Sequence, residues 1–377
     1  MKYIKLKDVC KINMGQSPDS SSYNESGEGI PFFQGNADFG DRYPVTRIWC
    51  SEPKKVAQEN DILISVRAPI GAINYSKEKC CIGRGLAALT VDKTKISEKL
   101  LFWVLKAKKE ELNRQGTGST FKAISKKSLE ELLIPQIDIK EQEKDVEILE
   151  KIYMIIQNKH KELKLLTDLI SARFVEMFGD PITNSKLLPI EKIEERYFLK
   201  AGITTKAEDI HDYLKDKYEI PCYGGNGIRG YVENLSYEGC YPIIGRQGAL
   251  CGNVQYATGK FHATEHAVLV STLKNDNTMW VYYMLKLMDL YRYHTGAAQP
   301  GLAVKKLNTI DVIVADINLQ NQFAAFVHQI NKSKFVIHKF LYCTTHNTKS
   351  IIKPRPNTKE SGKIRGRETT CRRILTF

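Results

Sequence analysis

The chain repeats itself, and this internal duplication constrains its fold more than any other feature of the sequence. The segment IPFFQGN at 30–36 matches IPCYGGN at 220–226, an offset of 190 residues. Further along, GSTFKAISKKSL at 118–129 matches GAAQPGLAVKKL at 296–307 with an offset of 178. Because the matches keep their order and nearly their spacing, we expect two diverged copies of one architecture.

The first part of each copy is predicted to be a mixed α/β globule with many loops. Short runs rich in Val, Ile, Tyr and Phe, broken by Gly, Asn and Pro, are typical of strands, and helical spacing of apolar residues indicates helices. The expected strands are 61–66, 86–91, 241–245 and 266–272, and the expected helices are 100–115 and 278–293. The fold class is therefore α/β (mixed α+β), with two pseudo-repeated units.

A long helix is predicted after the first globule. From 141 to 178 the apolar residues recur at helical spacing, Asp138 is suited to cap the start, and a Gly-Asp-Pro sequence follows the end. A long helix with one apolar stripe needs a partner stripe. The comparable segment of the second copy starts near Leu319 and loses its periodicity after Leu341.

These patterns divide the chain into five segments. We expect globular units at 1–137 and 180–315, long helices at 138–179 and 316–341, and a basic, disordered tail at 342–377. The tail combines two prolines and clustered threonines with no apolar periodicity, which is typical of disorder.

Charge alone does not identify a partner. The net charge of +13 favours a polyanion such as nucleic acid, but residues 342–377 hold nine Lys or Arg against two Glu, and the rest of the chain carries only +6. No apolar run of about 18 residues is present, so no membrane span is expected. The start of the chain lacks the apolar stretch of a secretory signal, and nine cysteines without a C-x-x-C pair indicate free thiols, so a cytoplasmic location is expected.

Two diverged α/β units that alternate with two long helices resemble the DNA specificity subunit of type I restriction–modification systems. The resemblance covers about 1–341 and is strongest in IPFFQGN and in the segment at 118–142 with its copy. It implies that each globule is a target recognition domain that reads one half of a split double-stranded DNA site. The antiparallel helix pair, a coiled coil, would set the distance between the domains and provide a docking surface for methyltransferase subunits.

The same resemblance implies that this chain has no catalytic site and binds no cofactor directly. S-adenosylmethionine, ATP and Mg²⁺ are expected on partner methyltransferase and restriction subunits. The sequence departs from the family pattern after Leu341, so an inactive variant produced by a frameshift or recombination stays an alternative.

Residues that read DNA are expected among polar side chains on loops at similar places in both copies, because Arg, Lys, Asn and Gln reach base edges. The candidates in the first copy are Gln34, Asn36, Arg67, Arg84, Ser119 and Lys122, and those in the second copy are Asn226, Arg229, Arg246, Gln247, His266 and Gln299. Asn and Gln beside Gly also form turns, and an Arg after a strand is often in a surface ion pair, so only some of the candidates are expected to touch DNA.

The second long helix looks shorter than the first, so part of the first apolar stripe is predicted to lack a partner. The residues concerned are Val146, Leu149, Ile152 and Ile156. We expect a methyltransferase subunit, the tail or a second copy of the chain to cover them.

Other chemistry finds weak support. GNGIRG at 225–230 lacks the helix that a dinucleotide site needs, and HATEH at 262–266 enters a strand, where its two His would not share the helix face that a zincin needs. No metal site is predicted. The remaining alternative from another class is a stand-alone metal-dependent nuclease, built on Asp19, Glu52 and Lys54.

Overall fold

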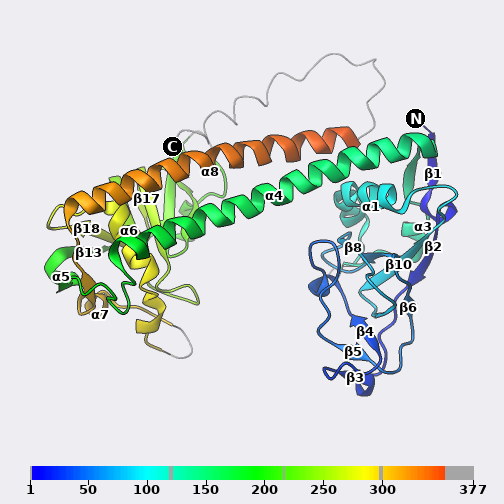
Figure 1. The fold of residues 1–377 in the computed structure, drawn as a ribbon, viewed down its shortest axis with the longest axis horizontal. Coiled ribbons are helices and arrows are strands. Elements are labelled where there is room, and N and C mark those ends of the chain that lie inside the picture. Colours follow the sequence, from blue (N-terminus) through cyan, green and yellow to red (C-terminus); the bar gives the residue numbers. More distant parts are fainter. Residues whose placement is uncertain (1, 119–121, 215–216, 297–299, 353–377) are drawn as a thin grey trace, which may run out of the picture. The chain divides into compact units, whose positions relative to one another are not determined.

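The computed structural model of the chain describes residues 2–118, 122–214, 217–296 and 300–352 (Figure 1). Two compact units divide the chain. Unit 1 holds residues 1–157 together with the chain from 341 onward, and unit 2 holds residues 158–340.

Unit 1 is built from short strands and three short helices, together with the first part of a long helix. Its strands are β1 (Lys2–Lys5), β2 (Cys10–Met14), β3 (Tyr23–Asn24), β4 (Ile30–Phe33), β5 (Trp49–Cys50), β6 (Val56–Ala57), β7 (Ile62–Ser65), β8 (Ile73–Tyr75), β9 (Cys80–Ile82), β10 (Leu86–Val91) and β11 (Leu133–Gln136). Its helices are α1 (Glu98–Ala107), α2 (Lys109–Gln115), α3 (Lys126–Glu130) and the start of α4 (Ile139–Phe178). The strands form sheets ordered β2-β10-β7-β8 and β3-β5-β4-β9-β6, with β1 paired to β11.

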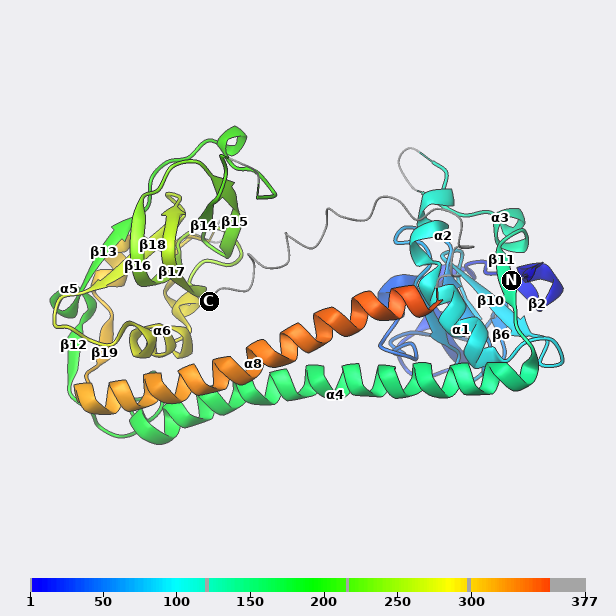
Figure 2. The ribbon, with the colours of Figure 1, turned by 90° about the horizontal axis from the view of Figure 1, so that it is seen from above.

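Unit 2 repeats this plan with longer strands. Its strands are β12 (Ile190–Lys192), β13 (Tyr197–Ala201), β14 (Ile220–Gly224), β15 (Gly227–Val232), β16 (Tyr237–Gly245), β17 (Val254–Ala263), β18 (Ala267–Thr272) and β19 (Asp311–Ile313). Its helices are α5 (Ile193–Arg196), α6 (Thr278–Leu287), α7 (Val304–Asn308), the end of α4, and α8 (Ile317–Ile352) as far as residue 340. One six-stranded sheet has the order β13-β18-β16-β17-β14-β15 (Figure 2).

The strand pairing confirms the predicted duplication and the mixed α/β fold class. The order β2-β10-β7-β8 in unit 1 corresponds to β13-β18-β16-β17 in unit 2, and β1-β11 corresponds to β12-β19. In both units the strand that carries the IP repeat, β4 or β14, lies parallel to a neighbour, β9 or β17, within otherwise antiparallel pairing.

A buried glutamine holds the start of each long helix to its own unit. Gln142 and Gln320, which the repeat aligns, are 1% and 0% exposed. The Oε1 of Gln142 accepts from the amide of Ser97 at 2.7 Å, and the Oε1 of Gln320 accepts from the amide of Asn277 at 2.8 Å. Each Nε2 donates to the carbonyl five residues before it. Because Ser97 and Asn277 are the N-cap residues of α1 and α6, each glutamine joins a long helix to a short one.

Helix α4 contributes apolar side chains to the cores of both units. Val146, Leu149 and Tyr153 pack into the core of unit 1. In unit 2, Phe174 packs edge-on against Phe323 of α8, with ring centroids 5.4 Å apart. Thr167 of α4 accepts from the Nζ of Lys334 of α8 at 2.9 Å, so the two helices run antiparallel within unit 2 (Figure 2).

Two predicted helices are shorter than expected. The helix expected at 100–115 is two helices, because the chain bends at Lys108, whose amide donates to both Val104 and Leu105. The bend buries Leu112 fully and lets α2 pack closely on the loop at Gly71. The helix expected at 278–293 ends at Leu287, and a 3₁₀ turn follows it.

The predicted end of the second long helix at Leu341 is wrong. Helix α8 continues to Ile352, so the predicted disordered tail is wrong for residues 342–352. The segment 317–352 contains neither Gly nor Pro, and weak helix propensity at Thr and Asn does not break a helix that has already started. The rest of the predicted tail, 353–377, lies outside the described residues.

Candidate nucleic-acid interface

A cavity lined by both polar and apolar residues lies in unit 2. It has a volume of about 470 Å³ and is lined by the turn between β14 and β15, the start of β15, the loop after β16 and the residue before β18. Four of the six candidates from the second copy line it: Asn226, Arg229, Gln247 and His266. These residues come from three separate stretches of the sequence, and the fold gathers them around one opening.

Close backbone contacts between glycines bring these segments together. A Cβ added to Gly245 would lie 2.2 Å from the carbonyl oxygen of Gly225, and a Cβ added to Gly225 would lie 3.2 Å from the carbonyl oxygen of His266. Any larger residue at Gly245 would force the β14–β15 turn away from the end of β16. The glycines therefore hold Asn226, Arg246 and His266 close together.

Two polar atoms are buried without a hydrogen-bond partner among the described residues, one on His266, which lines the cavity, and one on Arg246, which directly precedes the lining residue Gln247. They are the Nε of Arg246, a half-buried residue whose amide donates to the carbonyl of His266 at 3.1 Å, and the Nδ1 of His266. The other ring nitrogen of His266, Nε2, lies 3.2 Å from a carboxylate oxygen of Glu265. Unpaired polar atoms in such a position are expected where a ligand supplies the missing partner.

Unit 1 gathers its candidates in a matching way. The Oγ of Ser17 accepts from the Nε2 of Gln34 at 3.0 Å and from the amide of Arg84 at 3.4 Å, so Gln34 and Arg84 lie together. A Cβ added to Gly85 would lie 2.4 Å from the carbonyl oxygen of Gln34. Asn36 is half-buried at the start of the short turn that follows.

In each unit, the segment that follows a helical element, α2 in unit 1 and the 3₁₀ turn Leu290–Tyr293 in unit 2, pairs with the loop after a buried strand, β7 or β16. In unit 1, Arg67 and Thr117 both bridge to Ala123, and the carbonyl of Lys122 accepts from Ala68 at 3.1 Å. In unit 2, Gln247 and Thr295 both bridge to Gly301. Arg67, Lys122 and Gln247 are exposed at these positions. The predicted candidates Ser119 and Gln299 belong to the same segments but lie outside the described residues.

The sequence reasoning missed the apolar part of the unit 2 cavity. Ile228, Ala249 and Leu250 also line it, and all three are exposed. The sequence did contain a signal for these residues, because Ile228 directly precedes the candidate Arg229, and Ala249 and Leu250 closely follow the candidate Gln247.

The weak motifs have structural roles. The GNGIRG sequence forms the tight turn after β14 and the first part of β15. The ring nitrogens of His262 are both engaged by hydroxyls, Nε2 with Thr205 at 2.8 Å and Nδ1 with Ser236. Within the described residues, no group of three or more His, Cys, Asp or Glu side chains could hold a metal ion. Asp19 and Lys54 form an ion pair at 3.0 Å.

The prediction that the first half of α4 presents an uncovered stripe at Val146 and Leu149 is wrong. Both are under 10% exposed because unit 1 itself covers them, and Ile152 and Ile156 are half-buried. The exposed apolar residues of this half lie on other faces of the helix. They are Ile139, Ile148, Met154 and Ile155.

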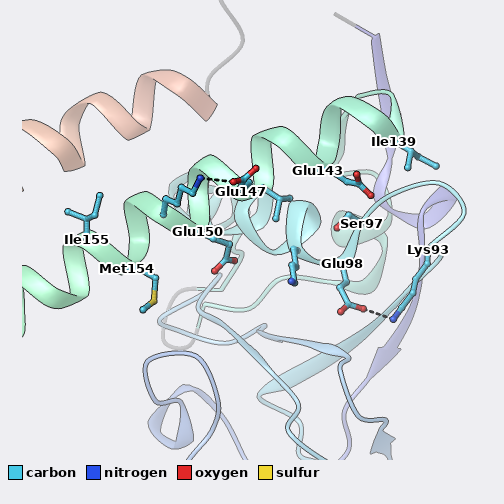
Figure 3. Close-up of a pocket in the computed structure, with 12 residues that line it drawn as sticks. Lys93, Ser97, Glu98, Ile139, Glu143, Glu147, Glu150, Met154 and Ile155 are labelled. Atoms are coloured by element: carbon cyan, nitrogen blue, oxygen red, sulfur yellow. Dashed lines mark hydrogen bonds and ion pairs between the residues drawn. The ribbon is translucent and has the colours of Figure 1, made fainter.

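Three of these residues line a groove of about 990 Å³ in unit 1 (Figure 3). The groove is also lined by charged residues of both signs, which are the glutamates Glu98, Glu143, Glu147 and Glu150 and the lysines Lys93, Lys99 and Lys151. Glu147 pairs with Lys151 at 2.5 Å, and Glu98 pairs with Lys93 at 2.8 Å (Figure 3). Glu150 faces inward to Arg42, and the hydrogen bond from that guanidinium lowers the pKa of Glu150.

No helix in the described part of the chain has the length and apolarity needed to cross a lipid bilayer.

Comparison with known proteins defines the class first. The sequence model of the family "Type I restriction modification DNA specificity domain" matches residues 1–167 and again residues 199–341. One chain therefore holds two DNA specificity domains, and their cores are those of unit 1 and unit 2.

Individual relatives narrow this to one kind of protein. The type I restriction enzyme EcoprrI specificity subunit of Escherichia coli is 32% identical over 364 residues, and the match covers 88% of each chain. A Methanocaldococcus jannaschii protein named as the MjaX specificity subunit is 47% identical over 152 residues, which are 40% of this chain and 36% of that one. The crystal structure of the type I restriction–modification S subunit from M. genitalium has the same fold, with a TM-score of 0.58 at 17% identity over 93% of this chain and 95% of that one. The chain belongs to the specificity subunits of type I restriction–modification systems.

Proposed function

We propose that the chain recognises a bipartite double-stranded DNA site, with each unit reading one half, and that it carries out no catalysis itself. The observation behind this proposal is the matching loop geometry of the two units. In each unit three features meet at one end. They are an Arg that follows a buried strand, a Gly-rich turn, and a segment that follows a helical element and pairs with the loop after the buried strand. Because the side chains at this end differ between the units, the two half-sites should differ and the whole site should be asymmetric.

Selection from a library of randomised duplexes tests this proposal. We expect the selected DNA to carry two short unlike motifs separated by a gap of constant length. A single uninterrupted motif, or no enrichment over random DNA, would contradict the bipartite reading.

We further propose that the chain acts in the cytoplasm and directs partner subunits. Methyltransferase subunits would bring S-adenosylmethionine to an adenine in each half-site, and an ATP-dependent restriction subunit would join them. All the described cysteines are free, as in a reducing compartment. DNA cleavage by the purified chain that depends on Mg²⁺ and stops with a chelator would favour the nuclease alternative instead.

The groove on α4, which combines exposed apolar residues with charged residues of both signs, is our candidate for the methyltransferase docking surface. Met154 is 54% and Ile155 is 45% exposed, and a partner that covers them would bury apolar area. The double variant Met154→Glu with Ile155→Glu should weaken co-purification with methyltransferase subunits by at least tenfold and leave specific DNA binding unchanged. Leu165→Glu on the same helix, at a site 57% exposed but outside the groove, is the matched control.

Reconstitution separates an active subunit from the inactive variant. A complex of the full chain with its methyltransferase subunits should methylate the selected site. Specific DNA binding without assembly or methylation would favour a variant damaged after Leu341.

A further inference from the structure

Two apolar side chains that line the unit 2 cavity are exposed to solvent. Ile228 is 55% exposed and Leu250 is 52% exposed, although the polar residues Arg229, Gln247 and His266 line the same cavity. Single apolar residues are common on protein surfaces. Two that line one cavity beside polar side chains form a contact surface for an apolar group.

The backbone holds both side chains in place. Ile228 is paired with Tyr223 across the β14–β15 hairpin. The loop that carries Leu250 is closed by the amide of Asn253 bonding to the carbonyl of Leu250 at 3.1 Å, and by Cys251, which is buried. The side-chain amide of Asn253 also donates to Asn226 at 2.7 Å, which ties this loop to the hairpin turn. The two apolar side chains thus line one cavity from two separate segments, each held by hydrogen bonds.

We propose that Ile228 and Leu250 recognise the C5-methyl group of thymine in the half-site that unit 2 reads. This inference rests on the proposed DNA-reading function. In unmodified DNA, thymine alone presents a methyl group in the major groove, and apolar side chains are its usual contact. The neighbouring Asn226, Gln247 and Arg229 supply hydrogen-bonding groups for the base edges around that methyl group.

The corresponding loop of unit 1 carries no exposed Ile or Leu among its described residues. After Arg67 it has Ala68 and Pro69, which are exposed but smaller than Leu250, and Ile70, which is fully buried. Recognition of a methyl group should therefore be confined to one half of the site.

The test replaces thymine by deoxyuridine, which differs only by the missing methyl group, in one half-site at a time. Binding of the full chain to unmodified synthetic duplexes is measured by titration. One half-site should be sensitive, with affinity falling about fourfold for each contacted methyl, the equivalent of burying one CH₂ group. The double variant Ile228→Ala with Leu250→Ala should bind thymine and uracil duplexes equally. Its affinity for the uracil duplex should match that of the unaltered protein, which shows that the variant is folded.

Leu273→Ala is the matched control, because Leu273 is 57% exposed in unit 2 but does not line the cavity. It should keep the full difference between thymine and uracil. The inference is overturned if the half-site that unit 2 reads contains no A·T pair, if uracil is tolerated in both halves, or if the double variant still discriminates. Absence of any preference for the selected site with thymine present would instead overturn the proposed function itself.

Discussion

The arginines that follow a buried strand in each unit have different surroundings. Arg246 is half-buried, and its Nε has no partner among the described residues, whereas Arg67 is exposed. A guanidinium held by the protein loses less side-chain entropy when it binds than a free one does. Arg246 is therefore the stronger candidate for base recognition, and Arg67 has the freedom expected of either a base or a phosphate contact.

Arg246→Ala should weaken binding to the cognate site by about 1–3 kcal/mol if the side chain makes a bidentate contact with guanine. The loss should appear only when the half-site of unit 2 is intact, and titrations with one half-site scrambled at a time measure this. Arg67→Ala should behave likewise for the other half-site. Equal losses on random DNA would identify a phosphate contact, and Arg173→Ala, on the side of α4 and paired to Glu176, is the control.

His262 should make the stability of unit 2 depend on pH. Burial lowers its pKa below the ordinary value of 6.5, and Glu265 opposes this only in part. The unfolded chain therefore binds a proton that folded unit 2 does not, so stability is full above about pH 6.5 and falls as the pH drops below it. Unfolding of the full chain in urea between pH 5 and 7.5 measures the effect, and His262→Asn should flatten the dependence in that window.

At the scale of elements, the two long helices are attached to their units by the same device. Gln142 and Gln320 each satisfy the first amide of a short helix and a carbonyl ahead of their own helix. The two units nevertheless differ around α4. Unit 1 adds a guanidinium of Arg42 beside the Tyr153 ring, 5.3 Å from its centroid, whereas unit 2 packs Phe174 and Phe178 against Trp280.

Gln142→Ala should destabilise unit 1, and Gln320→Ala should destabilise unit 2. Each change leaves a partly buried backbone amide unpaired, which costs up to about 1–3 kcal/mol. The urea midpoint of the affected transition should fall, while the transition of the other unit should stay in place. Gln322→Ala, on the exposed face of α8, should change stability by less than about 0.5 kcal/mol, and an equal effect there would contradict the attachment role.

At the scale of the whole molecule, α4 belongs to two cores at once. Its first half carries Val146 and Leu149 into unit 1, and its second half carries Ile170 and Phe174 into unit 2. Sharp kinks in helices occur almost always at Pro, at Gly/Ser pairs or where a group is inserted, and α4 contains neither Pro nor Gly. The number of base pairs between the half-sites should therefore be fixed.

Adding or removing one or two base pairs between the half-sites should reduce specific binding to the level of a single half-site. An insertion of about ten base pairs restores the rotational phase but not the distance, so it should fail as well. Binding assays on a set of duplexes with graded gaps check this. Tolerance of several gap lengths would mean that α4 does not act as a rigid connection.

Much of this architecture could be predicted from local patterns. The repeat at 30–36 and 220–226 predicted two copies, and α4 was placed within one residue of its observed ends because apolar spacing and stop signals are local. The Gly-rich turn that carries Asn226 was also identified, because such turns between strands are local features, whereas Arg229 lies in β15 and His266 just before β18.

Only the tertiary structure determined which faces of α4 are buried and which loops meet at the unit 2 cavity. The first half of α4 has apolar residues on several sides, so periodicity alone could not show that unit 1 buries Val146 and Leu149 and leaves Met154 and Ile155 exposed. Neither could the sequence show that Gly225 and Gly245 bring separate loops to one cavity that also holds Ile228 and Leu250. Burial of a helix face and closure of a cavity depend on contacts between residues far apart in the chain, and no local pattern records which of the available partners the folded chain selects.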